Sequence, residues 1–275
     1  MMKLKIFAAI IFALFCNHAV AWTGWSNGTM LSLSKAHSQM QSPLWIKEFP
    51  ALMSQENTHR IYFQAGVFSD MRYIKENTAS TAAISLGYKK SSFGLHYSYS
   101  GFSVYNEQQM GFSYGQNFGK RWGLGLSASY ITHNKIENEK GDRSLNISIS
   151  TVCKISSSWK IYSLAEIPVT LYSSQKKTLS ERYYFRIGVG YSVLENLSIG
   201  VDIAKDLRYP LQGGVGLSYL LAQHFFIYAS SEIYPFKNMI GIGYISKRWN
   251  IEWYGSYQSP LGFTTSVGVA WKISR

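Results

Sequence analysis

From residue 60 to its C-terminus the chain repeats one pattern, in which apolar side chains alternate with small or polar ones. Phe185 and Ile187, for example, alternate with Arg186 and Gly188. Because successive side chains of a β-strand point to opposite faces, each segment predicts a strand with one apolar and one wet face. The segments run about 9–11 residues, the length that crosses a bilayer at a tilt, whereas strands of soluble domains average about 5–6. The pattern therefore predicts an all-β, transmembrane antiparallel β-barrel.

The number of segments predicts about 14 strands, so that the barrel would occupy residues 60–275. The expected strands lie near residues 60–67, 80–88, 93–101, 107–116, 122–133, 144–154, 159–167, 182–192, 197–205, 211–219, 224–231, 238–245, 249–257 and 264–273. The links between them are alternately short and, in most cases, longer. Outer-membrane barrels have short periplasmic turns, longer outer loops and an even number of strands, with aromatic girdles at the strand ends. We therefore expect the short links in the periplasm.

The first 21 residues read as a secretory signal peptide. Lys3 and Lys5 form a positive region, residues 6–15 form an apolar run, and Ala19-Val20-Ala21 offers a small-residue cleavage site. The apolar run is too short for a transmembrane helix, which needs about 20 residues. We expect the mature chain to be exported and to reside in the outer membrane.

Residues 22–59 break the alternating pattern and contain Pro43 and Pro50. They would form either a plug that folds into the barrel or a further periplasmic segment of one or two strands. A barrel of this size leaves an interior that its own side chains cannot fill, which favours the plug. The candidate plug residues are Trp45, Phe49, Pro50 and Leu52. Their expected neighbours are the small inward residues Gly188, Gly200 and Gly214.

The formal net charge is +12, of which Lys3 and Lys5 contribute 2 within the signal peptide. Such a charge often accompanies nucleic-acid binding. Here the basic residues lie mainly in the predicted turns and loops, with no basic patch on a soluble domain. We expect lipid phosphates or acidic solutes as partners, and no nucleic acid.

Four charged residues fall on the predicted inward faces of strands: Arg186, Asp202, Glu252 and Lys272. Charges that face lipid near the midplane cost about 2–4 kcal/mol, so the barrel alone requires their inward placement. They would form either a paired network in a water-filled lumen or a charged ladder that selects solutes.

The spacing of the histidines does not indicate a metal site. No histidine of the mature chain has another histidine or a cysteine at the spacing typical of metal ligands. We expect no metal and no cofactor. His96 or His133 beside Ser98 or Ser129 would be the general base of a hydrolase. A histidine among serines on a lumen face is more commonly a solvated pore residue, and we expect no catalytic residue.

Four aromatic residues fall in or beside the predicted longer loops: Tyr209, Tyr234, Phe236 and Phe263. They would form a rim that captures apolar ligands or a partner protein, or they would pack within their own loops.

Several loop segments resemble those of the PorV/PorQ-like outer-membrane proteins of Bacteroidota, which are related to the FadL-type fatty-acid channels. They are residues 101–105 (GFSVY) followed by Glu107, residues 205–210 (KDLRYP) and residues 257–263 (YQSPLGF). Residues 49–52 (FPAL) stand where those families carry an Asn-Pro-Ala plug segment, with Phe49 in place of the asparagine. The resemblance implies a fourteen-stranded barrel with a plug, and its members range from lipid channels to components of secretion machines.

These patterns predict a non-enzymatic outer-membrane barrel that binds or passes a hydrophobic small molecule, with the plug as its gate. One alternative is a docking barrel for a secreted protein in a secretion or surface-attachment system. The other is an outer-membrane lipid hydrolase, which would need a serine and a histidine within hydrogen-bond reach.

Overall fold

The computed structural model describes ten stretches of the chain: residues 45–54, 59–68, 78–101, 105–135, 142–172, 183–207, 210–221, 223–234, 236–258 and 262–273. The predicted signal peptide, residues 1–21, lies outside them. So does most of the segment 22–59, of which the structure describes two short helices. These are α3 (Trp45–Glu48) and α4 (Pro50–Met53). No described helix has the length and apolar character needed to cross a membrane.

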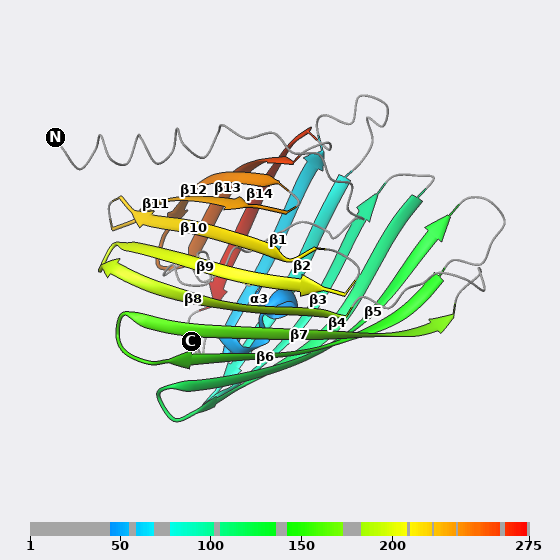
Figure 1. Ribbon diagram of the computed structural model, residues 1–275, viewed down its shortest axis with the longest axis horizontal. Coiled ribbons are helices and arrows are strands. Elements are labelled where there is room, and N and C mark those ends of the chain that lie inside the picture. The colour runs from blue at the N-terminus through cyan, green and yellow to red at the C-terminus, as the bar shows by residue number, and fades with distance from the viewer. Residues whose placement is uncertain are drawn as a thin grey trace.

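Fourteen β-strands follow the two helices. They are β1 (His59–Phe68), β2 (Thr78–Tyr88), β3 (Ser91–Gly101), β4 (Tyr105–Phe118), β5 (Trp122–Lys135), β6 (Asp142–Lys154), β7 (Trp159–Tyr172), β8 (Tyr184–Leu194), β9 (Leu197–Asp206), β10 (Gln212–Leu220), β11 (Phe225–Glu232), β12 (Lys237–Ile245), β13 (Trp249–Gln258) and β14 (Gly262–Ile273). Each strand pairs antiparallel with its neighbours in the sequence, and β1 pairs with β14 to close the barrel (Figure 1). The predicted fold class and strand number are therefore confirmed.

Side-chain exposure follows the predicted alternation. On β9, Ser198, Gly200 and Asp202 are buried toward the interior, whereas Val201 and Ile203 are exposed on the outer surface. The arrangement is inverted relative to a soluble protein, because the apolar side chains face outward. A closed sheet with such an exterior satisfies its backbone hydrogen bonds internally and presents an apolar surface to lipid.

The strands differ in length around the ring. β4 to β7 have 13 or 14 residues each, whereas β8 to β13 have 8 to 11. Figure 1 shows the long hairpins in green, extending beyond their shorter neighbours. One side of the barrel wall is therefore taller than the other.

β7 is the strand whose predicted end, at residue 167, is furthest from the observed one, Tyr172. Pro168 indicated a loop, yet the strand continues through it, paired with β6. On the other side, the pairing of β7 with β8 ends at Glu166↔Tyr184. Proline is tolerated at strand edges, where its missing N–H breaks no hydrogen bond of the ladder. The open edge explains why Pro168 does not terminate β7.

Candidate functional site: the barrel lumen

The two helices lie inside the ring of strands and pack on the inner wall (Figure 1). α3 contacts β2, β3 and β4, and α4 contacts β4, β5 and β6. Phe49 separates the helices with φ −148° and ψ 69°, outside the helical region, which is disfavoured for a residue that precedes proline. Pro50 then begins α4, a position where its fixed φ favours a helix and its missing N–H costs nothing. We call residues 45–54 the docked segment.

Wall side chains hydrogen-bond the backbone of the docked segment. Ser150 accepts from the Ala51 amide at 2.9 Å, and Ser92 donates to the Met53 carbonyl at 3.0 Å. Ser113 donates to the Ile46 carbonyl at 2.5 Å, and Asn117 Nδ2 to the Ser54 carbonyl at 2.5 Å. Helices of four residues leave most backbone groups without an internal partner. The small polar face of β3 to β6 supplies those partners.

Glycines on the same wall make room for the docked segment. A Cβ on Gly125 would lie 2.1 Å from the Ala51 nitrogen, and one on Gly115 would lie 2.5 Å from the Pro50 carbonyl oxygen. A Cβ on Gly94 would lie 2.4 Å from Ile46 Cγ2. A side chain at any of these positions would collide with the segment, so the absence of one allows close packing.

The apolar side chains of the docked segment form one buried cluster with the wall. Phe49 meets the ring of Tyr162 on β7 edge to face, with centroids 6.0 Å apart, and Leu52 belongs to the same cluster. Phe49, Pro50 and Leu52 are therefore buried inside the barrel, whereas the Trp45 side chain lies outside the described residues.

The expected docking surface on Gly188, Gly200 and Gly214 is wrong. Those glycines lie on β8, β9 and β10, and both helices contact β2 to β6 instead. Glycines and serines recur on the inner face of most strands, so composition does not distinguish one side of the barrel from the other. The Gly214 position faces Asp202 and Glu232.

The four predicted lumen charges all point inward, and two of them form a pair. Arg186 on β8 donates from Nε to Asp202 Oδ2 on β9 at 2.6 Å, and its Nη2 contacts the same oxygen. Glu252 is buried on β13, and Lys272 is half-buried on β14. Glu232 and Lys237, on β11 and β12, interact electrostatically with this group and had not been predicted. The charges that are brought together form a layer in which Arg186 and Lys237 lie among the carboxylates of Asp202 and Glu232.

Three aromatic rings and one methionine on the inner face of β11 to β13 form a second buried apolar cluster: Phe226, Tyr228, Met239 and Tyr254. The Phe226 and Tyr228 rings are stacked, with centroids 6.1 Å apart. They lie over Gly243 and Gly241 of β12, where a Cβ would approach the rings to 1.9 and 2.0 Å. We call these four residues the lumen aromatic cluster.

The sequence analysis did not identify the lumen aromatic cluster. On β11, Phe225 and Ile227 face outward while Phe226 and Tyr228 face inward, so both faces begin with apolar residues. The usual contrast between an apolar outer face and a small or polar inner face is therefore lost on this strand. The available signal was the pair Gly241 and Gly243 on β12, which lie on one face of the strand and leave room for large rings opposite them.

The serine–histidine contact that the hydrolase alternative would need exists, but it lacks the features of a catalytic pair. His96 Nε2 on β3 lies 3.2 Å from Ser129 Oγ on β5, passing over Gly111. His96 is buried, and within the described part of the chain its Nδ1 has no hydrogen-bond partner. A catalytic imidazole is usually held there by a carboxylate or another acceptor. The described residues also contain no cluster of three or more histidine, cysteine or acidic side chains that could bind a metal.

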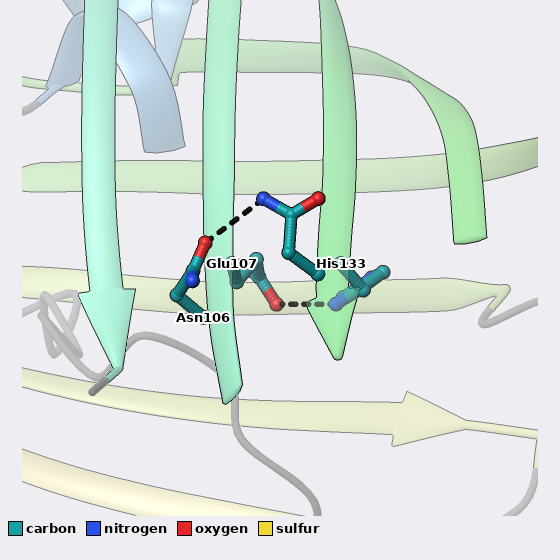
Figure 2. A network of polar contacts seen from close by, with 4 residues as sticks. Asn106, Glu107 and His133 are labelled. Carbon is teal, nitrogen blue, oxygen red and sulfur yellow. Dashed lines mark hydrogen bonds and ion pairs between the residues drawn. The ribbon is translucent and has the colours of Figure 1, made fainter. Parts of the chain in front are cut away.

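His133 lies instead near the end of β5 that is opposite to the short turns. Its Nδ1 is 3.4 Å from Glu107 Oε2 on the adjacent strand. Figure 2 shows these two side chains pointing toward one another, beside the hydrogen bond of 3.0 Å from Asn134 to Asn106. These cross-strand contacts join β4 to β5 where the long strands end.

Only part of the predicted aromatic rim lies within the described residues. Tyr209 is outside them, while Tyr234 and Phe236 are half-buried between β11 and β12. Phe263 belongs to β14 rather than to a loop, because Gly262 adopts a positive φ of 79° and pairs with Gln258. Its exposed ring packs on Tyr257 of β13, with centroids 5.0 Å apart. Phe263 thus packs within its own hairpin.

No protein-family model matches this sequence, and neither does any curated protein. Solved structures do resemble it. The Pseudomonas putida toluene transporter TodX aligns with a TM-score of 0.66 and 8% identity, covering 86% of this chain and 95% of TodX. The CymD monoaromatic hydrocarbon channel gives 0.64 and 7%, covering 89% and 98%. A Pseudomonas aeruginosa FadL homologue gives 0.58 and 9%, covering 87% and 95%.

These similarities establish a common barrel fold with channels of the FadL type. None of the three proteins is described as an enzyme or as part of a secretion system. The specific resemblance to PorV/PorQ-like proteins stays a prediction, as does the Bacteroidota origin.

Proposed function

We propose that this chain is a non-enzymatic barrel of the bacterial outer membrane that binds or passes a hydrophobic small molecule. In this proposal residues 1–21 direct export, and the longer loops lie outside the cell. Residues 22–59 act as a plug, of which the docked segment 45–54 is the described part.

The lumen aromatic cluster carries the proposal. A pore that served only polar solutes would need a hydrated wall, like the serines and glycines on the inner face of β3. Here the wall from β11 to β13 instead places Phe226, Tyr228 and Tyr254 inward. Aromatic rings provide a large apolar surface, worth about 25 cal/mol for each Å² that a solute covers. These rings are buried in the described state, so in this proposal they would offer a binding surface to an apolar molecule once their neighbours move aside.

The proteins that share this fold support the same class of solute. Two of them are described as a toluene transporter and a monoaromatic hydrocarbon channel. We take a small aromatic hydrocarbon as the test solute on that basis.

The plug would act as the gate of this passage. The docked segment brings Ile46, Phe49 and Leu52 into the lumen beside the aromatic side chain of Tyr162. Apolar side chains placed there displace water from the passage. Movement of the segment away from the wall between β2 and β6 would then open a path.

The charged layer around Arg186 and Asp202 would keep the passage hydrated and its charges balanced. Pairing removes most of the net field that a solute would meet, so this layer would not select among ions. An uncharged solute fits such a lumen better than an anion or a cation.

Uptake of radiolabelled toluene by intact cells that express the protein tests the proposal. We expect uptake well above that of cells without the protein. Tyr228→Ser and Phe226→Ser should each lower it by roughly tenfold, because each removes an aromatic surface worth about 1.5–3 kcal/mol when buried. Ile227→Ala is the matched control, since Ile227 lies between them on the same strand and faces outward.

The amount of folded barrel in each strain is measured from its change in gel mobility on heating, and uptake is expressed per folded barrel. Uptake no higher than in cells without the protein would reject the proposed function. Equal uptake by wild type and both serine variants would reject the role of the aromatic cluster.

A further inference from the structure

The short turns of the barrel carry an uneven distribution of charge. The six turns that join β2 to β3, β4 to β5, β6 to β7, β8 to β9, β10 to β11 and β12 to β13 contain six basic residues and one acidic residue, Glu195. The basic residues are Lys89, Lys90, Lys120, Arg121, Lys247 and Arg248, and all six are exposed. We call them the basic arc.

The basic arc occupies one side of the ring. Its three turns join β2 to β3, β4 to β5 and β12 to β13, and these strands surround the closing pair β1 and β14. The three remaining turns, between β6 and β11, hold no lysine or arginine, although the half-buried Lys154 and Lys160 face one another at the strand ends beside the β6–β7 turn. Glu195 lies in the β8–β9 turn. Six positive charges therefore gather along the part of the rim that runs from β12 through β14 and β1 to β5.

Within the described residues, the side chains of the basic arc form no ion pair. Lys89 Nζ lies 5.3 Å from the centre of the Tyr88 ring, which neutralises no charge. By contrast, the charged layer in the lumen places opposite signs together, as in the pair of Arg186 and Asp202. The charges of the basic arc are available to an anionic partner.

Exposed aromatic residues adjoin each basic pair. Trp122 follows Lys120-Arg121 and Trp249 follows Lys247-Arg248, so that the tripeptide Lys-Arg-Trp occurs twice at the start of a strand. Tyr88 directly precedes Lys89-Lys90, and all three rings are exposed. The Trp249 ring also stacks on that of Trp271, with centroids 5.7 Å apart. Tryptophan and tyrosine at strand ends mark the membrane–water interface.

The position of the aromatic residues fixes the depth of the basic ones. A strand advances about 3.3 Å per residue, so a lysine or arginine one or two residues beyond the ring lies about 3–7 Å further from the hydrocarbon. Lipid phosphates occupy that level. Basic residues at a membrane surface attract anionic lipids by about 1 kcal/mol each.

We propose that the basic arc binds the headgroups of anionic phospholipids in the leaflet that the short turns face. The barrel would then carry a patch of such lipids along the wall from β12 to β5, on the side where the docked segment packs. The rim from β8 to β11, with Glu195 and no lysine or arginine in its turns, would not enrich them. This interaction is independent of the solute that passes through the lumen.

Quenching of tryptophan fluorescence by brominated lipids tests the inference. The full-length mature protein is placed in vesicles of brominated phosphatidylglycerol or brominated phosphatidylcholine mixed with unlabelled lipid, and the relative affinity is measured. Of the eight tryptophans that contribute to the signal, Trp122 and Trp249 adjoin the basic arc, so part of the quenching reports on the lipid beside it. We expect wild type to prefer phosphatidylglycerol by about tenfold, and the preference to fall in 0.5 M salt as charges are screened.

The decisive variant replaces all six arc residues with glutamine, and we expect its preference to fall to within about twofold of none. Lys247→Gln with Arg248→Gln should lose part of it. The matched control, Arg143→Gln with Lys205→Gln, removes two exposed positive charges at the other end of the barrel and should change nothing. The heat-dependent change in gel mobility confirms that each variant forms a folded barrel.

Three results would overturn the inference. One is an unchanged preference in the six-residue variant, and another is an equal loss in the control variant, which would indicate a general charge effect. The third is equal quenching of wild type by both lipids. In that case an acidic protein would be the partner that the charge of the arc fits.

Discussion

Alanine at position 125 would push the docked segment off the wall of the barrel. The new methyl group would lie 2.1 Å from the Ala51 nitrogen and 2.4 Å from the Pro50 carbonyl carbon. Ordinary contacts between such atoms are about 3.5 Å, so the segment must retreat by about 1.5 Å. That movement would stretch the 2.9 Å hydrogen bond from the Ala51 amide to Ser150 beyond its useful range.

The cost of the substitution follows from these two effects. Overpacking of a tight contact costs about 1–3 kcal/mol, and a lost hydrogen bond about 1 kcal/mol. Docking of the segment should weaken by about 2–4 kcal/mol, which corresponds to roughly a hundredfold increase in the undocked population. The new methyl group would also lie 2.6 Å from Ser150 Oγ on β6, so that hydroxyl must turn away, but the barrel itself should stay intact because the strand backbone is not displaced.

Hydrogen–deuterium exchange of the protein in lipid nanodiscs measures this change. Peptides that cover residues 45–54 should exchange about a hundredfold faster in Gly125→Ala, whereas peptides from β9 and β10 should not change. Gly213→Ala is the control, since its Cβ would meet Ile233 at 3.5 Å and the Asp202 carbonyl oxygen at 3.9 Å, both ordinary contacts. Equal protection of residues 45–54 in wild type and Gly125→Ala would refute the docking geometry.

Three further predictions concern the membrane topology and the lumen. Ile187→Arg should lower the stability of the folded barrel in vesicles by about 2–4 kcal/mol, as measured by urea unfolding, because Ile187 faces lipid; unchanged stability would place it on the wrong face. An epitope tag inserted within residues 136–142 should bind antibody on intact cells and one within residues 155–158 should not; the reverse labelling would invert the orientation. Arg186→Met should cost about 3–5 kcal/mol by leaving the buried Asp202 unpaired, and Asp202→Leu in the same chain should recover most of it; no recovery would mean that the pair does not act as a unit.

The alternating pattern was sufficient to predict the fold, because the face to which a side chain points is a local property of its strand. Whether a residue such as Val201 faces lipid or lumen is set by its parity along the strand, and the sequence displays that parity. The end of β7 was mispredicted because the effect of Pro168 depends on whether a neighbouring strand needs its N–H. The pairing of β7 with β8 that ends at Glu166 decides this, and it is not visible in the sequence.

The candidate site was predicted less completely, because it depends on which strands face one another across the lumen. The burial of Phe49 and Leu52 could be expected from their apolar character, but periodicity gives the face of a residue and not its place around the ring. The expected contact with Gly188 therefore fell on the wrong strands. The observed contact is with Gly115 and Gly125, and it depends on hydrogen bonds from the segment to wall serines and Asn117. In the sequence these polar residues look the same as those of any hydrated lumen, so they do not mark the docking surface.

Ion conductance across planar bilayers tests most directly whether the lumen is a passage that the N-terminal segment closes. The mature protein is compared with a variant that lacks residues 22–55, after both have been shown to form folded barrels. The docked segment packs apolar side chains on the inner wall between β2 and β7. If it closes the lumen as we propose, the intact protein should conduct little and the shortened one should conduct steadily. Equal conductance of the two proteins would contradict the account, because the segment would then not obstruct the lumen and the proposed passage would have no gate.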